Sequence, residues 1–514
     1  MPTGAAKLSF VLTGFDIEGE FEELVAVRRE LAAPLIGKRI KVAQVFEFAT
    51  KLQEAYIRAG YILVRVVVSP QELSRKARAK LQVIDGFIER VDVSALPEAV
   101  RGRVSAVLAP LVGKHHLTQG ELQRRLLIAG ETPGLEQQST LAAGTEVGGS
   151  ILILTGRYRP VSANLYGDDA MPVTLGTWQV ASLLALNNIF GAGEQVAVNA
   201  TGYPDRDFFT RFPTRRFLGA SLALPLGIEG LKLSVTATDG RTTPRVDPTV
   251  ATQGLFDQLR TQLAFDAVKS RDFELTFSAH FDATEERINS LVFTPPISLS
   301  LDRVRVAREA VDGIWRNRET GTTISFGATV SQGLPIFGAR TTAGATPLLP
   351  LSRQGADAVF MKADGRLEAT QSLPGDFVAA INAFAQTAFN RPLLTSEQFN
   401  LAGVKMLSGF PAGTLPADSA WVVRGELQRP ISAPLASLVP YLFGATGERI
   451  FHEPTILELG TVHASNVGGG LRLFLPRAAD FFPGGLAFVE GSRRLSTDPT
   501  LEGWRVFAGA MLFY

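Results

Sequence analysis

The side chains that could carry chemistry in this chain are few and widely spaced. Its 514 residues include no cysteine and 5 histidines, so thiolate catalysis, disulfides and cysteine-based zinc sites are excluded. His115 and His116 are adjacent, but without acidic residues close by in the sequence they make a poor metal site, and none is expected. No serine, histidine and aspartate share the spacing of a catalytic triad. We therefore expect a protein that is not an enzyme and binds no cofactor.

Other polar motifs have simpler interpretations than catalysis or ligand binding. The glycine-rich stretches "GAGEQ" and "VGGG" lack the lysine and hydroxyl residue that follow in a phosphate loop. Asp168 and Asp169 fall where a turn is expected. Arg424 and Glu426 alternate with apolar neighbours, so they could line a conduit or form ordinary ion pairs on a wall. Because Lys plus Arg (51) nearly balances Asp plus Glu (50), no nucleic-acid partner is expected.

The residues up to about 157 mix helical and strand patterns. "KLSFVLTGFDI" alternates like a strand, and "EFEELVAVRRELAAPLIGK" and "KVAQVFEFATKLQEAYIRAGY" repeat apolar residues at helical spacing. "YILVRVVVSP" and "AKLQVIDGFIERVDV" return to strand patterns. A weaker second copy of this order, strand, helix, helix, strand, strand, follows. The pattern predicts two similar α+β units of roughly 75 residues each.

From residue 158 onward the alternation typical of strands replaces the helical period. In "FELTFSAHFD", the apolar residues from Phe273 to Phe281 share one face, whereas His280 and the other polar residues share the opposite one. "WVVRGELQ" likewise sets Trp421 against Arg424 and Glu426. His280, Arg424 and Glu426 are therefore expected on the polar face, with His280 as a wall residue and not a ligand.

The length of these segments distinguishes a membrane barrel from a soluble sandwich. They run about 9–12 residues, and a tilted strand needs ~9–11 residues to cross a bilayer, whereas sandwich strands are shorter. At roughly 22 residues per strand and connection, 158–514 makes about 16 strands. No stretch approaches the ~18 apolar residues of a transmembrane helix. The closing "WRVFAGAMLFY" is expected to be the last strand, paired with the first, and the start "MPTGAAKLSF" shows no signal peptide in this chain.

The order of several segments resembles that of two-partner secretion transporters, outer-membrane proteins of the POTRA-barrel superfamily. "YIRAGYILVRVVVSPQEL" resembles their first POTRA domain, and "ETPGLEQQSTLAAGTEVGGSILIL" is similar to the second one and its exit into the barrel. "LGTWQVASLLALNNIFGAGEQVAVNATG", "LLTSEQFNLAG" and "ASNVGGGLRLFLP" resemble barrel segments. The resemblance implies POTRA 1 at 1–86, POTRA 2 at 87–157, and a 16-stranded antiparallel transmembrane β-barrel at 158–514. The inward-folding loop is expected around 396–420.

The resemblance also implies a mechanism and a location. POTRA domains in the periplasm would bind an unfolded secreted exoprotein by strand addition, and the barrel in the bacterial outer membrane would conduct it outward. The strand from Tyr61 to Pro70 is the expected exposed edge, with Tyr61, Leu63, Arg65 and Val67 as candidate substrate contacts. Outer-membrane lipids, and other outer-membrane proteins, are further expected partners.

The motifs that hold the inward-folding loop in this family are altered here. The family pairs the arginine of a VRGY-like tetrad on the loop with the aspartate of an F-x-D-x-G motif on the wall. The tetrad position reads Leu407, Ser408, Gly409, Phe410. The wall position has Phe443, Ala445 and Gly447. Both partners of the ion pair are thus replaced together, which can be nearly neutral, whereas losing one strands a buried charge.

Two other segments look like the missing motifs but are set aside. "VVRG" at 422–425 lies in the following strand, and "FVEG" at 488–491 comes too late in the sequence. We expect the loop to be held by packing of Phe410 and by polar lumen residues, or not to be held in the barrel at all. The predicted function is export of a partner exoprotein. A barrel that has lost transport and serves as a structural or binding subunit is the alternative, which the missing pair favours.

Overall fold

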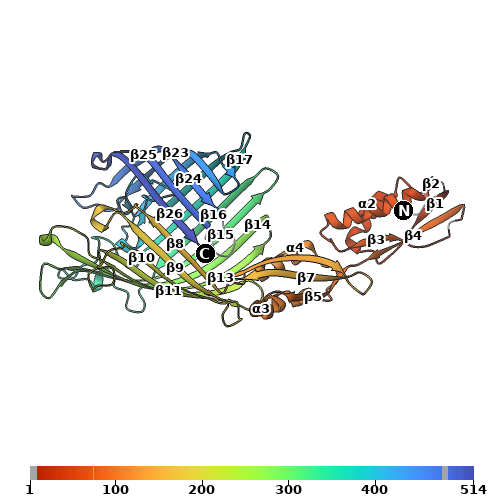
Figure 1. Cartoon of the computed structure of the whole chain (residues 1–514), viewed down its shortest axis with the longest axis horizontal. Coiled ribbons are helices and arrows are strands. Elements are labelled where there is room, and N and C mark those ends of the chain that lie inside the picture. Colours follow the sequence, from red (N-terminus) through yellow and green to blue (C-terminus); the bar gives the residue numbers. More distant parts are fainter. Residues whose placement is uncertain (1–7, 73, 477–483) are drawn as a thin grey trace. The chain divides into compact units, whose positions relative to one another are not determined.

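The computed structural model describes residues 8–72, 74–476 and 484–514. It divides the chain into two compact units, one ending at Tyr158 and the other beginning at Arg159 (Figure 1). Part of the opening stretch, for which the sequence predicts no leader, falls on residues 1–7 and lies outside the described residues. No helix of the described residues is long and apolar enough to cross a membrane.

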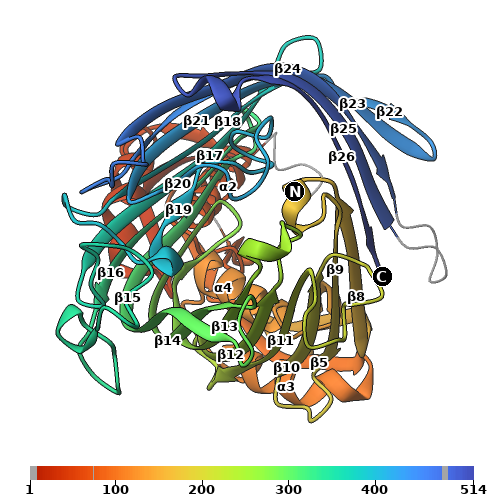
Figure 2. The ribbon, with the colours of Figure 1, turned by 90° about the vertical axis from the view of Figure 1, so that its left-hand side faces the viewer.

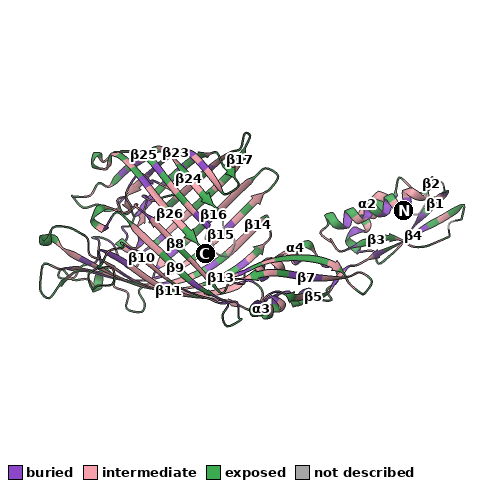
Figure 3. Ribbon diagram, in the orientation of Figure 1, coloured by how far each residue is buried: buried purple, intermediate pink, exposed green. Residues whose placement is uncertain are grey.

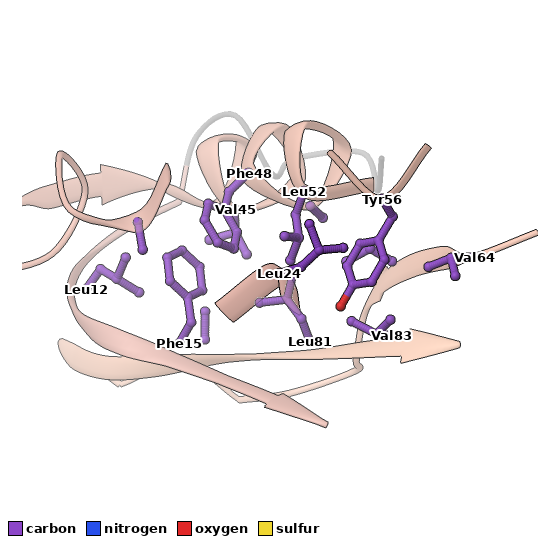
Figure 4. Packing of buried hydrophobic residues seen from close by; sticks show 14 of the residues in the cluster. Leu12, Phe15, Leu24, Val45, Phe48, Leu52, Tyr56, Val64, Leu81 and Val83 are labelled. Atoms are coloured by element: carbon purple, nitrogen blue, oxygen red, sulfur yellow. The ribbon is translucent and has the colours of Figure 1, made fainter. Parts of the chain in front are cut away.

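The first unit begins with a four-stranded sheet covered by two helices. Its sheet has the order β2-β1-β4-β3, in which β1 and β4 run parallel. Helix α2 turns one apolar face to the sheet because its buried residues repeat at helical spacing. Phe15 and Phe48 stack at 3.9 Å between the layers, beside Leu52 and Tyr56 (Figure 4). The elements are β1 (Ser9–Glu18), α1 (Val25–Ala32), β2 (Arg39–Lys41), α2 (Val42–Arg58), β3 (Arg65–Val68) and β4 (Lys76–Ile84).

A three-stranded sheet and two further helices complete the first unit. The sheet has the order β5-β7-β6, so β6 pairs with β7 alone in this sheet. The hydroxyl of Thr118 caps α4 by accepting the backbone N–H of Glu121. The elements of this second sheet follow the predicted order strand, helix, helix, strand, strand, whereas the first sheet has the additional short strand β2 between its two helices. The elements are β5 (Phe87–Ala95), α3 (Glu98–Leu108), α4 (Gln119–Gly130), β6 (Leu135–Ala143) and β7 (Gly149–Tyr158).

The second unit is a closed antiparallel barrel of 16 strands, as predicted (Figure 2). Short β22 continues the wall position of β21, because both pair with β23. The strands are β8 (Val161–Asp168), β9 (Gln179–Asn187), β10 (Gln195–Gly202), β11 (Arg215–Leu226), β12 (Leu231–Thr242), β13 (Thr252–Lys269), β14 (Phe273–Ser290), β15 (Ile297–Asn317), β16 (Thr322–Gly333), β17 (Met361–Leu373), β18 (Phe377–Thr387), β21 (Ser419–Gln428), β22 (Ile431–Ala433), β23 (Ala436–Ile450), β24 (Thr461–Leu475), β25 (Gly484–Ser496) and β26 (Gly503–Phe513).

The last strand closes the barrel on the first, as the sequence predicts. β26 pairs with β8 from Gly509 opposite Asp168 to Phe513 opposite Asn164. Tyr514 extends this seam, since its N–H donates to the carbonyl of Ala163 at 2.8 Å and its carbonyl accepts the N–H of Ala163. The seam thus pairs the backbone groups that an open sheet would leave exposed in lipid.

More exposed and more buried residues alternate along the strands of the wall (Figure 3). On β21, Trp421, Val423 and Leu427 are exposed, whereas Arg424 and Glu426 are buried on the opposite face. The strand lengths correct one expectation, because apart from the three residues of β22 they range from 8 residues in β8 to 21 in β15. Hairpins can continue to pair beyond the apolar band, which is ~25 Å tall.

Candidate functional site

The segment from 388 to 418, here called the inner loop, folds back against the inner face of the barrel. It connects β18 to β21 and contains the short pair β19 (Phe399–Asn400) and β20 (Pro416–Ala417), which lie inside the ring of strands in Figure 2. The loop was expected around 396–420, whereas in the structure it begins at 388 and ends at 418. Phe399 stacks on Phe384 of β18 at 3.7 Å, which fixes the entry of the loop.

The tetrad position lies at the centre of this contact. Leu407 is buried, Ser408 is 3% exposed and Phe410 is 1% exposed. Leu407 and Phe410 belong to one apolar cluster that includes Ala445 of β23. Gly409 approaches the wall so closely that a Cβ added to it would lie 2.8 Å from Oγ of Ser492. Packing of this kind needs glycine at 409, because any larger residue would push the loop away from β25.

Arg424 of β21 is the wall residue that bonds the tetrad position. Its side chain is 0% exposed, and its Nη1 donates to Oγ of Ser408 at 2.6 Å. Its Nε donates to Glu426 and its Nη2 to Glu490 of β25, each at 2.7 Å. Its guanidinium lies 3.7 Å from the ring centre of Phe443. Its Nη1 also donates to the backbone carbonyl of Met406 at 3.4 Å, so Arg424 bonds four polar groups and a π face at once.

Ser408 completes the arrangement by donating its hydroxyl hydrogen to Oε1 of Glu490. We call Ser408, Arg424, Glu426 and Glu490 the loop anchor. Its only member on the loop is uncharged, and its charged members all belong to the wall. Arg472 of β24 donates to both oxygens of Glu426, at 2.8 and 3.0 Å, so the two arginines and two glutamates balance.

The neighbours of Arg424 explain the small residue at the wall motif. Ala445 lies directly opposite Arg424 in the pairing of β21 with β23. Because alanine is small, the guanidinium of Arg424 can extend over Phe443. Gly447 allows a close approach as well, since a Cβ there would lie 2.6 Å from the carbonyl oxygen of Trp421. The wall therefore supplies its own arginine beside Phe443.

Both segments that sequence reasoning set aside contribute to the anchor. "VVRG" provides Arg424 and "FVEG" provides Glu490, although neither lies on the loop. The alternation of the sequence predicts that Arg424 faces inward, but it does not predict the contact of Arg424 with Ser408. Glu490 was not identified as a site residue. The exposed Val489 and Leu495 on either side place Glu490 on the inner face, and this pattern was the signal that could have identified it.

A second set of contacts holds the last residue of the loop, Asp418, just before β21 begins. Asp418, which is fully buried, accepts from Nη1 of Arg353 at 2.5 Å and from the backbone N–H of Leu393 at 3.0 Å. It also accepts the backbone N–H of His452 at 2.8 Å. Since Arg353 and His452 lie in two other connections at this end of the barrel, Asp418 joins three connections together.

The remaining sequence-predicted residues lie away from the anchor. His280 bonds Ser278 at 2.9 Å on β14. The expected strand from Tyr61 begins only at Arg65, so Arg65 and Val67 lie on β3 and Tyr61 and Leu63 precede it. The correction arises because Tyr61 closes the turn after α2, where its hydroxyl donates to Glu23. That bond raises the pKa of the Tyr61 phenol and lowers the pKa of Glu23.

The two adjacent histidines do have an acidic neighbour, contrary to the expectation from the sequence. Asp85, 30 residues earlier in the chain, lies 3.1 Å from Nδ1 of His115 and 3.6 Å from Nε2 of His116. Folding brings it there because it stands in the short connection between β4 and β5. Across the described ranges, no three or more histidines and carboxylates form a group that could hold a metal ion.

Comparison with known proteins agrees with this architecture. The model of the haemolysin secretion/activation protein ShlB/FhaC/HecB family matches residues 148–450, and that of the ShlB-type POTRA domain matches 10–86. The heme/hemopexin transporter protein HuxB of Haemophilus influenzae (strain 86-028NP) is 21% identical over 433 residues, covering 82% of this chain and 73% of HuxB.

Two solved structures share the fold at low sequence identity. CdiB from Escherichia coli matches with a TM-score of 0.78 and 17% identity, covering 100% of this chain and 92% of that chain. CdiB from Acinetobacter baumannii matches with a TM-score of 0.65 and 16% identity, covering 98% and 90%. With a family model that spans more than half of its length, the chain belongs to the haemolysin secretion/activation protein ShlB/FhaC/HecB family of outer-membrane two-partner secretion transporters.

Proposed function

We propose that this chain exports one partner exoprotein from the periplasm to the cell surface. The first unit stands in the periplasm and receives the unfolded exoprotein, and the barrel conducts it through the outer membrane. The observation that carries this proposal is a closed barrel with a loop folded against its inner face, where Ser408 of the loop contacts Arg424 of the wall. Outer-membrane lipids surround the exposed apolar residues of the wall. In this proposal the chain transports protein and has no enzymatic activity.

The outer edge of β6 is the better supported docking edge for an extended segment. β3, the edge expected from the sequence, has only four residues, and the N–H of Val66 is already bonded by the side chain of Gln53 at 3.1 Å. β6 has nine residues, and its middle, from 138 to 141, is exposed. Strand addition relies on unpaired backbone groups, so a long exposed edge favours it.

Release of the inner loop is compatible with this wall. When Ser408 leaves, Arg424 keeps Glu426 and Glu490 as partners, each at 2.7 Å. Departure of a loop arginine would instead strand a buried charge at ~3–5 kcal/mol, whereas losing a hydrogen bond to a charged group costs ~1.5–3 kcal/mol. The loop anchor by itself therefore adds only this smaller cost to release of the loop.

The proposal is tested by comparing the secreted and surface proteins of cells that produce the chain with those of cells that lack it. We expect one large exoprotein to disappear from the surface and medium, and to return when the chain is supplied again. If no exoprotein is lost, the chain serves as a structural or binding subunit of an outer-membrane assembly. Proteins that co-purify with it would then identify that assembly.

A further inference from the structure

A row of charged side chains crosses the inner face of the barrel from β13 to β17. Arg260 pairs with both oxygens of Asp282 at 2.8 Å, and Arg308 donates to Asp282 at 2.9 Å. Ser331 accepts from Arg308 at 2.8 Å and stands opposite Lys362 in the pairing of β16 with β17. Asp282 and Ser331 are fully buried and Arg308 and Lys362 nearly so, whereas Arg260 at one end of the row is partly exposed.

Glu397 of the inner loop completes this row. Its carboxylate accepts from Nη2 of Arg308 at 2.7 and 3.0 Å and lies 3.0 Å from Nζ of Lys362. Nζ of Lys362 also donates to the backbone carbonyl of Glu397 at 2.7 Å. Glu397 is 3% exposed. The loop thus inserts a buried carboxylate between two cations of the wall.

Glu397 supplies a negative charge that offsets the cations of the row. The wall contributes Arg260, Arg308 and Lys362 as cations, and Asp282 is the wall carboxylate that Arg260 and Arg308 share. Without Glu397 the row loses one negative charge, and Lys362 loses the carboxylate within ion-pair distance of it. Buried cations that lose a partner are strongly destabilised, so an emptied row favours another carboxylate.

We infer that the row from Arg260 to Lys362 binds acidic segments of the exported polypeptide, and that Glu397 occupies this site in the resting protein. The inference rests on the proposed export function and adds a preference for carboxylate side chains. The loop anchor has no such preference for a carboxylate, because its charged wall residues remain paired with one another after Ser408 leaves. The pair between Lys405 of the loop and Glu368 of β17 is exposed and screened by water, so its loss leaves no comparable site.

The test measures binding of short fluorescent peptides to the purified full-length chain in detergent. The probes are poly-glutamate, poly-lysine and poly-glutamine, and the variant is Glu397→Gln, which removes the loop carboxylate from Arg308 and Lys362 while keeping the loop. We expect poly-glutamate to bind Glu397→Gln about tenfold more tightly than the unchanged chain. The control Glu368→Gln, which removes an exposed carboxylate of the same wall, should leave poly-glutamate binding unchanged.

Two further variants keep the test decisive. Adding Arg308→Gln and Lys362→Gln to Glu397→Gln should abolish the gain, and replacing 389–417 by a glycine-serine linker should reproduce it. Heat-modified gel mobility verifies that each barrel is folded. The inference is overturned if Glu397→Gln increases the affinity for poly-lysine as much as that for poly-glutamate. It is also overturned if the increased affinity persists after Arg308 and Lys362 have been replaced. If cells export the exoprotein but the purified variants show no preference for poly-glutamate, the inference is overturned and the export function is unaffected.

Discussion

Replacing Ser408 by alanine should loosen the inner loop without disrupting the wall. The hydroxyl accepts from Arg424 at 2.6 Å and donates to Glu490, so the substitution removes two hydrogen bonds to charged groups. Arg424 and Glu490 remain bonded to each other at 2.7 Å, which offsets part of the loss. We therefore expect a net cost near that of one such bond, ~1.5–3 kcal/mol.

That cost translates into a large change in how often the loop leaves the wall. At ~1.4 kcal/mol per tenfold, the open population should rise by a factor of about 10–150. Because the chain has no cysteine, a single Ala402→Cys substitution on the loop provides a clean reporter in the buried cluster that the loop forms with the wall. The rate of its labelling by a maleimide follows the open population when closing is faster than labelling.

The matched control is Ser396→Ala in the same loop. Oγ of Ser396 is buried and has no hydrogen-bond partner among the described residues, so its removal should leave the labelling rate unchanged. The reasoning is refuted if Ser408→Ala labels within twofold of the parent chain. It is refuted equally if Ser396→Ala accelerates labelling as much as Ser408→Ala does.

Three other substitutions or conditions test the contacts separately. Gly409→Ala should also accelerate labelling, because its Cβ would lie 2.8 Å from Oγ of Ser492; an unchanged rate would contradict the close packing. Asp418→Asn should lower barrel stability by ~3–5 kcal/mol, seen as a lower temperature of gel-mobility change, because it strands the arginine it holds. The hydroxyl of Thr145, in the connection between β6 and β7, lowers the pKa of Glu89 below 4.5. Protection of the amides of this connection from hydrogen exchange should therefore be complete above pH 4.5 and decrease at lower pH, and Glu89→Gln should remove this pH dependence.

The barrel could be predicted because its determinants are local in the sequence. Alternation such as that from Phe273 to Asp282 specifies which face of a strand meets lipid, and the apolar ending required a partner strand. The first unit was predictable for a similar reason, since the apolar residues of α2 repeat at helical spacing. Each of these patterns spans only one element, so no distant residue is needed to recognise it.

The loop anchor could not be predicted because its members meet only in the folded barrel. Arg424 and Glu490 are separated by 66 residues, and no spacing rule connects them to Ser408. Sequence reasoning looked for an arginine on the loop, whereas the structure places the guanidinium on the wall. The start of β3 at Arg65 was misplaced because "YILV" has strand propensity but forms the turn after α2, where Tyr61 bonds Glu23.

Photo-crosslinking from the barrel wall during export would test the central claim most directly. A photoreactive residue at His280, on the inner face of β14, should capture the exoprotein in transit. The same residue at Phe277, which is exposed on the outer face of the same strand, should capture none. Equal capture at both positions, or export without any capture at His280, would contradict conduction through this barrel.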